Sequence, residues 1–302
     1  MDFKSKIFLI SGPTASGKSS FAIKLSKKIN GEIINADSMQ VYEELKILSA
    51  RPDPKSFQNI KHHLYGFHNV RNNFSTGDWL KLAIKKIKEI KRRKKIPIFV
   101  GGTGLYFKAL TNGLADIPNI PILFRNKIRL SQKKLGQKKF FQKLIKIDPL
   151  SKNRINATDV QRSIRAYEVK KFTNKSLHEW FKNTKSNFRE VEFFKIYVNF
   201  PRQELIQRIN QRTEQMFKLG AVKEVKRFIE SKVQKDKSVN KAIGIDEIKE
   251  YLNNKIELDE IKEKISIKTR QYAKRQSTWA RGNMENWTKL QPKEMDMFLK
   301  KF

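Results

Sequence analysis

The chain has 302 residues, enough for one or two domains with a sizeable core, and 38% of them are hydrophobic. It carries 65 Lys and Arg against 30 Asp and Glu, a formal net charge of +35, which favours a polyanionic partner such as nucleic acid. Because it contains no cysteine, disulfides, thiolate metal sites and cysteine catalysis are excluded.

The positive charge has a second explanation, a lysine-biased composition that decorates every surface, and composition alone leaves both open. The sequence has no apolar run long enough to span a bilayer, and we expect no signal peptide ahead of the first strand. It also lacks a strongly apolar amphipathic helix that could insert into a membrane surface. We therefore expect a cytoplasmic monomer without a membrane partner.

The first motif of the chain is a phosphate-binding loop. The residues Gly12-Pro13-Thr14-Ala15-Ser16-Gly17-Lys18-Ser19 fit the pattern G-x-x-x-x-G-K-[ST] between an expected strand at 6–10 and an expected helix at 19–28. Such a loop turns backbone N–H groups toward an anion, while Lys18 adds a point charge and the Ser19 hydroxyl can bind Mg²⁺. An ordinary glycine-rich turn is the alternative, but the flanking strand and helix favour a diphosphate or triphosphate site.

A carboxylate follows the second expected strand, at 32–35. Open α/β sheets bind ligands at the carboxyl ends of their strands, so Asp37 would face the phosphate loop. A catalytic role and a helix N-cap are both open for this residue. The segment His62-His63-Leu64 is expected to be a loop, and adjacent histidines point in different directions, so we expect no metal site there. Ser75-Thr76 should cap a helix that runs to about 93, and the basic run 91–95 at its end should be solvated.

A second glycine-rich turn, Gly101-Gly102-Thr103-Gly104-Leu105-Tyr106, follows the strand expected at 96–100. Thr103 is its only polar side chain before Tyr106, so we expect Thr103 to point at the substrate. Between 117 and 191 the strand signal disappears, and the segment is helical and basic. Within it, Gln161 and Arg165 fall near one helix face and Arg162 on the adjoining face. We expect an inserted helical module with a cationic surface.

The last third returns to the sheet with a strand at 194–198, and a helix follows from Pro201 to about Gly220. On it, Arg208 and Arg212 are four residues apart and could clamp a phosphate, although a solvated basic face is an equal alternative. A long basic helix from about 258 interleaves Tyr272 and Trp279 with cations such as Arg275. That pattern is typical of a surface that follows an RNA backbone and stacks on bases.

The predicted fold is therefore α/β, a parallel-sheet core like that of the P-loop NTPases with an inserted all-helical module. We expect three segments: residues 1–116 as the first part of the core, 117–191 as the helical insertion, and 192–302 as the completion of the core with basic C-terminal helices.

Together, these motifs resemble one family over nearly the whole chain, the tRNA dimethylallyltransferases, also called tRNA isopentenyltransferases. The motifs that carry the resemblance occur in the family's order: 12–19, 37–42, 62–64, 101–106, 159–168, 242–244 and 269–281. Three residues depart from the family pattern. Met39 stands where Ala is usual, Arg51 where Lys is usual, and Ile245 where Tyr commonly follows Ala-Ile-Gly.

The resemblance implies transfer of the dimethylallyl group from dimethylallyl diphosphate to N6 of the adenosine immediately 3′ of the anticodon, in tRNAs that read codons beginning with U. It implies that Asp37 is the general base, that Arg212 is a further diphosphate contact, and that Thr103 holds the reacting groups in line. It implies Mg²⁺ on Ser19 with the diphosphate, and the anticodon stem-loop of tRNA as partner. The residues expected against tRNA are Asp37, Ser38, Met39, Gln40, Thr103, Arg125, Gln161, Arg162, Ser163, Ile164, Arg165, Arg275 and Trp279.

Three other functions fit parts of the sequence. A phosphotransferase of the same fold, a nucleotide or RNA kinase, would have the same phosphate loop but no use for the Tyr, Trp and Arg residues of the last long helix. A prenyltransferase acting on free adenine nucleotides would not need the basic insertion. A non-catalytic RNA-binding module would leave Lys18 and Asp37 unexplained.

Overall fold

The computed structural model describes residues 3, 5–254 and 256–302, and these fall into two compact units. The first contains the chain up to Thr111 together with Phe188–Phe302, and the second contains Asn112–Asn187. Among the described helices, none is long and apolar enough to cross a bilayer.

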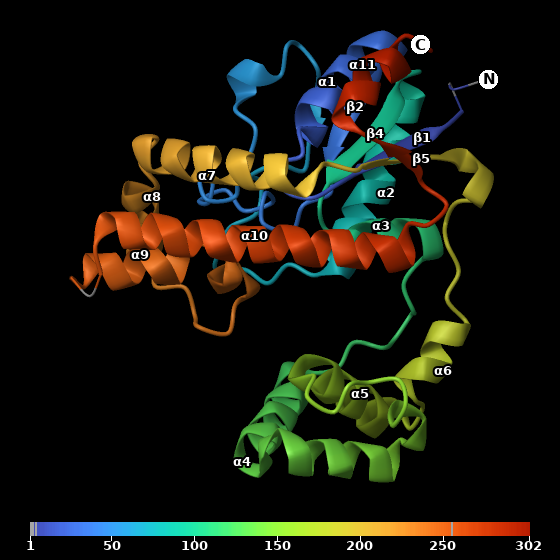
Figure 1. The fold of residues 1–302 in the computed structure, drawn as a ribbon. Helices are drawn as coiled ribbons and strands as arrows, with labels where there is room; N and C mark the ends of the chain where they lie inside the picture. The colour runs from blue at the N-terminus through green and yellow to red at the C-terminus, as the bar shows by residue number, and fades with distance from the viewer. Residues whose placement is uncertain (1–2, 4, 255) are drawn as a thin grey trace. The chain divides into compact units, whose positions relative to one another are not determined.

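The first unit is built on a six-stranded sheet in which every strand is parallel to its neighbours, in the order β3-β2-β4-β1-β5-β6 (Figure 1). The strands are β1 (Ile7–Ser11), β2 (Gly31–Asn35), β3 (His62–His63), β4 (Ile96–Gly101), β5 (Phe193–Val198) and β6 (Thr288–Leu290). The expected parallel α/β core is thus confirmed. The expectation of a loop at His62-His63 was wrong, because β2 pairs with these two residues as a short edge strand.

Some helices of this unit begin at residues with recognisable start signals. The helices are α1 (Lys18–Ile29), α2 (Thr76–Arg92), α3 (Gly104–Asn112), α7 (Arg202–Lys218), α8 (Ala221–Glu230), α9 (Ile245–Leu252), α10 (Leu258–Asn283) and α11 (Pro292–Leu299), with short 3₁₀ turns η1 (Pro54–Ser56), η3 (Glu190–Glu192) and η4 (Ser238–Lys241). Ser75 caps α2 as expected, and it forms a capping box with Asp78. Pro292 opens α11 at a position where its missing N–H costs nothing.

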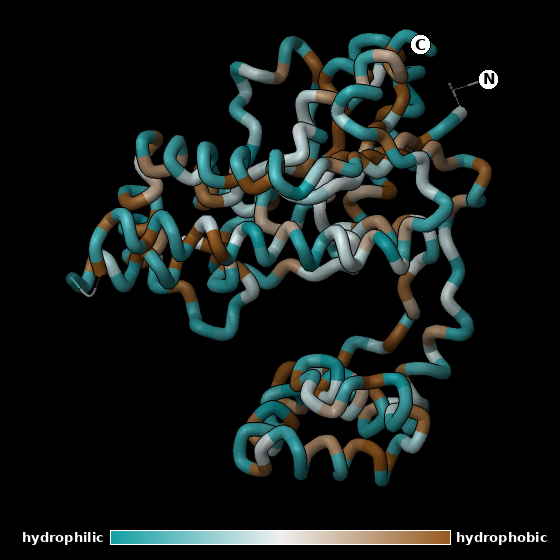
Figure 2. Tube along the Cα trace, viewed as in Figure 1, coloured by the Kyte–Doolittle hydropathy of each residue, from teal (hydrophilic) through white to brown (hydrophobic). Residues whose placement is uncertain are grey.

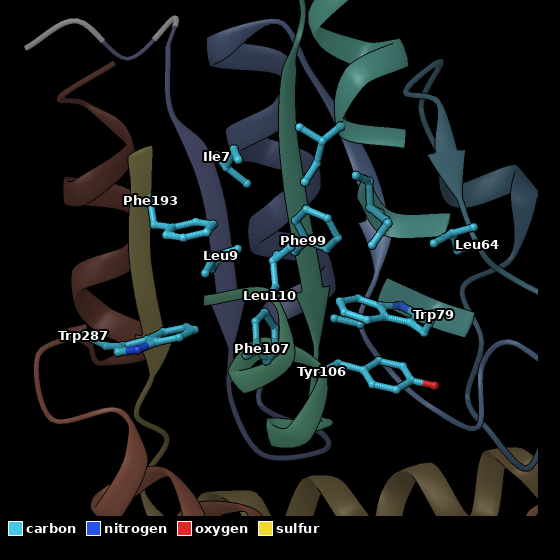
Figure 3. Packing of buried hydrophobic residues seen from close by; sticks show 14 of the residues in the cluster. Ile7, Leu9, Leu64, Trp79, Phe99, Tyr106, Phe107, Leu110, Phe193 and Trp287 are labelled. Carbon is cyan, nitrogen blue, oxygen red and sulfur yellow. The ribbon is translucent and has the colours of Figure 1, made fainter. Parts of the chain in front are cut away.

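The sheet is buried on both faces, as parallel sheets are. Along β1, Phe8 and Ile10 pack with α1 and α11, whereas Ile7 and Leu9 pack with α2 and α3. Figure 3 shows the second of these clusters, in which Trp79 lies beside Tyr106. Their rings are stacked at a centroid distance of 4.2 Å, and the Trp79 indole N–H donates to Asn35 O at 2.9 Å. Each fully buried side chain of this size contributes about 1.5–3 kcal/mol.

The C-terminal helices form a third cluster around the loop that follows β2. Buried residues of α8, α9 and α10 pack against Val41, Leu45 and Leu48 of that loop. In addition, the buried carboxylate of Glu224 on α8 accepts the backbone N–H groups of residues 46, 47 and 48. Helices α7 and α10 run alongside one another, as Figure 1 shows, and both alternate hydrophilic and hydrophobic residues in Figure 2. Helices α8, α9 and α10 therefore hold the loop after β2 in place.

The second unit is a small helical body. Its elements are α4 (Ile122–Ile147), η2 (Pro149–Ser151), α5 (Val160–Thr173) and α6 (Leu177–Lys182), and all of its residues are described. Helix α4 bends at Gly136, whose φ of 70° lies in the left-handed region that glycine tolerates. The bend lets Phe140 and Leu144 pack against α5 in one hydrophobic core.

Candidate active site

Three loops meet at the carboxyl end of the sheet, where parallel α/β folds place their ligands. The neighbouring strands β2, β4 and β1 end there, followed by Asp37, by the Gly101 turn and by the phosphate loop. The approach of the first two loops requires glycine, because a Cβ on Gly101 would lie 2.0 Å from Ala36 O. The sheet order therefore brings together motifs that are up to 90 residues apart.

The phosphate loop has the alternating backbone conformation of an anion-binding concavity. Ala15 and Gly17 both have positive φ, at 65° and 81°. Among the described residues, the buried Ser16 hydroxyl has no hydrogen-bond partner, so it remains available to a ligand. Lys18 Nζ donates to Pro13 O at 3.1 Å, which folds the lysine back over the loop. These features fit a bound phosphate group.

Two cations and one carboxylate line the same small cavity of about 130 Å³. Lys18, Asp37 and Arg212 contribute to its wall, together with Ser19 and Gln40. Burial lowers the pKa of Lys18 to about 8, while the Asp37 carboxylate raises it and Arg212 lowers it. Burial also lowers the pKa of Arg212, against the effect of Asp37. The wall thus carries strong positive charge beside one negative group.

Helix α7 directs its arginines toward the loop. Arg212 lines the cavity, and Arg208 approaches Gly17 closely, since a Cβ there would lie 3.5 Å from an Arg208 guanidinium nitrogen. The Arg208 guanidinium lies 4.9 Å from the centroid of the Phe200 ring, which fixes its direction. Arg212 thus reaches the cavity, whereas Arg208 is exposed, so a solvated face stays an alternative for Arg208.

Asp37 does not cap a helix, because the chain from Ala36 to Arg51 runs through turns and bends. One carboxylate oxygen of Asp37, Oδ1, accepts the backbone N–H of Met39 at 2.9 Å. Thr103 acts on the same loop: its hydroxyl accepts the N–H of Ser38 at 2.9 Å and donates to the Ser38 hydroxyl at 3.3 Å. Gln40 donates to the carbonyls of Ser49 and Ala50. Several hydrogen bonds therefore set the direction of the Asp37 carboxylate.

Helix α10 turns one face toward the site. Tyr272 is half-buried there, and burial and the Asp37 carboxylate both raise its pKa. Trp279 packs against Gly104, and the exposed Arg275 lies 5.8 Å from the centroid of the Tyr272 ring. Gln276, on the same face, hydrogen-bonds two of the loops. The sequence interpretation missed Gln276 and also Asn35, although the spacing 272, 276 and 279 places three side chains on one helix face.

In the helical unit, two arginines expected to contact RNA share one carboxylate. Glu168 is 1% exposed, and its oxygens lie 3.5 Å from Arg125 Nε and 3.7 Å from an Arg165 nitrogen. Burial raises the pKa of Glu168 and the arginines lower it. Gln161 and Arg162 are exposed, whereas Ser163 and Ile164 are buried in the interior of the unit.

The oxygen atoms beside the phosphate loop suit a metal ion that is bound mainly through the phosphate oxygens of a ligand. Within residues 3, 5–254 and 256–302, no group of three or more His, Asp or Glu residues could hold a metal ion. Ser19 and Asp37 nevertheless supply oxygen atoms in one cavity, and Mg²⁺ takes oxygen ligands together with phosphate oxygens. The residues present therefore fit a Mg²⁺ ion that arrives with a diphosphate.

Comparison with known proteins agrees with this geometry. The sequence profile described as IPP transferase matches residues 40–283, which is more than half of the chain. The chain belongs to the IPP transferase family. A tRNA dimethylallyltransferase of Pelagibacter ubique is 59% identical over 301 residues, covering 100% of this chain and 96% of that protein.

Solved structures of IPP transferases have the same fold. The crystal structure of a tRNA Δ(2)-isopentenylpyrophosphate transferase from Staphylococcus epidermidis has a TM-score of 0.69 and 32% identity, covering 98% of this chain and 96% of that one. A eukaryotic dimethylallyltransferase acting on tRNA has a TM-score of 0.82 and 28% identity, covering 95% of this chain and 73% of that one.

The three departures from the family's motifs have structural accommodations in this IPP transferase. Arg51 donates to Tyr42 O at 2.9 Å and packs against Gly66, where a Cβ would lie 1.7 Å from its guanidinium. Ile245 is fully buried in the cluster of C-terminal helices, and Met39 packs against the same cluster.

Proposed function

We propose that this IPP transferase moves the dimethylallyl group of dimethylallyl diphosphate to N6 of the adenosine immediately 3′ of the anticodon in tRNAs that read codons beginning with U. The observation that carries the proposal is the shared cavity of Lys18, Arg212 and Asp37. The reaction needs cations at a leaving diphosphate and a base at the attacking nitrogen, close to one another. Family membership and the +35 charge support tRNA as the acceptor.

In the proposed reaction, N6 forms a bond to C1 of the dimethylallyl group while the bond from C1 to the diphosphate oxygen breaks. The phosphate-loop N–H groups, Lys18 and Arg212 stabilise the charge that develops on the departing diphosphate. Asp37 accepts the proton that N6 loses. When bound at Ser19, Mg²⁺ would neutralise further diphosphate charge.

Thr103 takes a positioning role in this proposal. Its hydrogen bonds to the backbone and hydroxyl of Ser38 fix the loop that carries Asp37. Asp37, Ser38, Met39 and Gln40 would then meet the adenosine after it leaves its stack, and the exposed cations of the helical unit would bind the RNA backbone. The half-buried Arg125 and Arg165, oriented by Glu168, would add to this contact.

The direct test is incubation with unmodified tRNA, dimethylallyl diphosphate and Mg²⁺ without ATP, followed by nucleoside analysis. We expect N6-isopentenyladenosine in the RNA and release of one diphosphate for each modification. Parallel reactions contain AMP in place of tRNA, or ATP in place of dimethylallyl diphosphate. Product from AMP alone would support a free-nucleotide prenyltransferase, and ATP consumption without prenylation would support a kinase.

A further inference from the structure

One side chain joins the phosphate loop, the Gly101 turn and helix α10. The backbone N–H of Thr14 donates to Gln276 Oε1 at 2.8 Å, and Gln276 Nε2 donates to Gly102 O at 2.9 Å. A peptide N–H can only donate and a peptide carbonyl can only accept, so both bonds together fix which end of the amide is oxygen. Gln276 thus satisfies two backbone groups from segments 262 and 174 residues away.

The turn after β4 is shaped to receive α10. A Cβ on Gly102 would lie 2.1 Å from Gln276 Nε2, and a Cβ on Gly104 would lie 2.3 Å from the Trp279 ring. Gln276 and Trp279 are three residues apart on one face of α10, so they contact the glycines on both sides of Thr103. Because Thr103 hydrogen-bonds Ser38, the contacts between α10 and this turn are also linked to the loop that carries Asp37.

The hydrogen bond from Thr14 N–H to Gln276 acts where the phosphate loop is strained. Thr14 directly precedes Ala15, whose φ of 65° is disfavoured for a residue with a side chain. Anchoring the Thr14 N–H restricts the peptide that enters this turn. The loop is thereby held with its remaining N–H groups turned inward before any ligand binds, which lowers the ordering cost of binding.

We propose that Gln276 is a positioning residue that holds the phosphate loop in its diphosphate-binding shape and couples it to helix α10. That the ligand held there is a diphosphate rests on the proposed function, whereas the contacts of Gln276 do not.

The loop contact is tested by calorimetric titration with inorganic diphosphate and Mg²⁺. Gln276→Met keeps the length of the side chain and removes both hydrogen bonds, so we expect Kd to rise roughly 5- to 100-fold, the range for two neutral bonds. Gln271→Met is the matched control, because Gln271 is an exposed glutamine on the same helix α10. It should bind like the parent. A Gln276→Met protein that melts like the parent and binds within twofold of it would overturn the proposal.

A second pair of variants tests the same contact from the other side. Gly102→Ala should displace the Gln276 side chain and weaken diphosphate binding, because its methyl group would occupy the position of Nε2. In a Gln276→Ala background the methyl group has space, so Gly102→Ala should then cost little more. Losses that multiply in the double variant would show that Gly102 acts without Gln276 and would contradict the proposal.

Failure of the proposed function looks different from failure of this contact, because the parent would then not prenylate tRNA, whatever the effect of Gln276→Met on diphosphate binding.

Discussion

The buried amide of Asn35 hydrogen-bonds the backbone of Asp37 on both sides. Asp37 N donates to Asn35 Oδ1 at 2.8 Å, and Asn35 Nδ2 donates to Asp37 O at 2.9 Å and to Leu64 O at 2.9 Å. Asn35 is 0% exposed at the end of β2. The position of Asp37 is therefore set by the sheet, which suits a base that must meet its proton at hydrogen-bond distance.

The first prediction concerns this carboxylate. Asp37→Asn keeps the shape of the side chain and the acceptor for Met39 N–H, but removes the basic oxygen. We expect the single-turnover rate of dimethylallyl transfer to fall about 10²- to 10⁴-fold, the range for general base catalysis, with RNA affinity within a few-fold of the parent. A variant that turns over at nearly the parental rate would remove Asp37 from the mechanism.

The second prediction is a pH dependence of diphosphate binding. Burial lowers the pKa of Lys18 to about 8 in the free protein, and a diphosphate prefers the protonated lysine. As pH rises through about 8, Lys18 loses its proton and affinity should fall, approaching tenfold per pH unit. Lys18→Arg stays charged throughout, so its titration between pH 7 and 10 should show only the ionisation of the ligand. Coincident profiles for parent and Lys18→Arg would contradict the assignment.

The lowered pKa of Lys18 also makes the stability of the protein depend on pH. The folded state binds the Lys18 proton less tightly than the unfolded chain, whose lysine has a pKa near 10.5. Between about 8 and 10.5 the unfolded chain thus holds more protons, so this group makes the free energy of unfolding rise with pH across that window. Urea unfolding of Lys18→Met, which lacks the titrating group, measures the contribution by difference.

The sequence predicted the elements that depend on local patterns, and missed the pairings that depend on the fold. Apolar runs indicated four of the strands, but two-residue β3 and three-residue β6 are too short to leave such a signal. Composition placed the basic run 91–95 in solvent, whereas Arg93 donates to the buried Glu32, 61 residues earlier. Only the structure shows that Asp37 does not cap a helix, and only the structure shows the contacts of Gln276.

The third prediction follows from that buried Glu32. Its carboxylate accepts two bonds from Arg93, at 3.2 and 2.6 Å, and one from His63 Nε2 at 2.7 Å. Glu32→Gln should lower the free energy of unfolding by roughly 1–3 kcal/mol, because charge-assisted bonds are lost at a site without solvent access. The measurement is urea unfolding at pH 7. Arg92→Ala changes an exposed neighbour and should stay within about 0.5 kcal/mol of the parent.

Acid should reduce the stability that the hydrogen-bonded group of Glu32, Arg93 and His63 contributes. Burial raises the pKa of Glu32, but the bonds from Arg93 and His63 outweigh it and leave the pKa below its usual value. Burial lowers the pKa of His63, although Glu32 raises it. Both groups then take up protons more readily when unfolded, so their contribution is lost as pH falls, for His63 from about 6.5 and for Glu32 from about 4.3. If Glu32→Gln and the parent lose stability equally between pH 5 and 3, Glu32 has no part in it.

The last prediction treats the excess charge as a tRNA footprint on two surfaces. The insertion surface comprises Gln161, Arg162 and Arg165, and the α10 surface comprises Lys274, Arg275 and Arg281. Arg162 is 74% exposed in its side chain, and all three α10 cations are exposed. Other basic residues of α10 are paired, Lys268 with Glu247 and Arg270 with Glu263.

If these cations neutralise phosphates, log affinity for tRNA should fall linearly with log salt, by roughly 0.9 for each contact, taking the value for B-DNA. Arg162→Gln and Arg275→Gln should each make the slope shallower by about one unit, because each removes one phosphate contact. Lys88→Gln, an exposed lysine of α2, is the control and should leave the slope unchanged. Trp279→Ala should lose affinity with little change in slope, since stacking does not release counterions. Slopes that respond equally to Arg162, Arg275 and Lys88 would attribute the charge to compositional bias, because only a defined footprint distinguishes one surface cation from another.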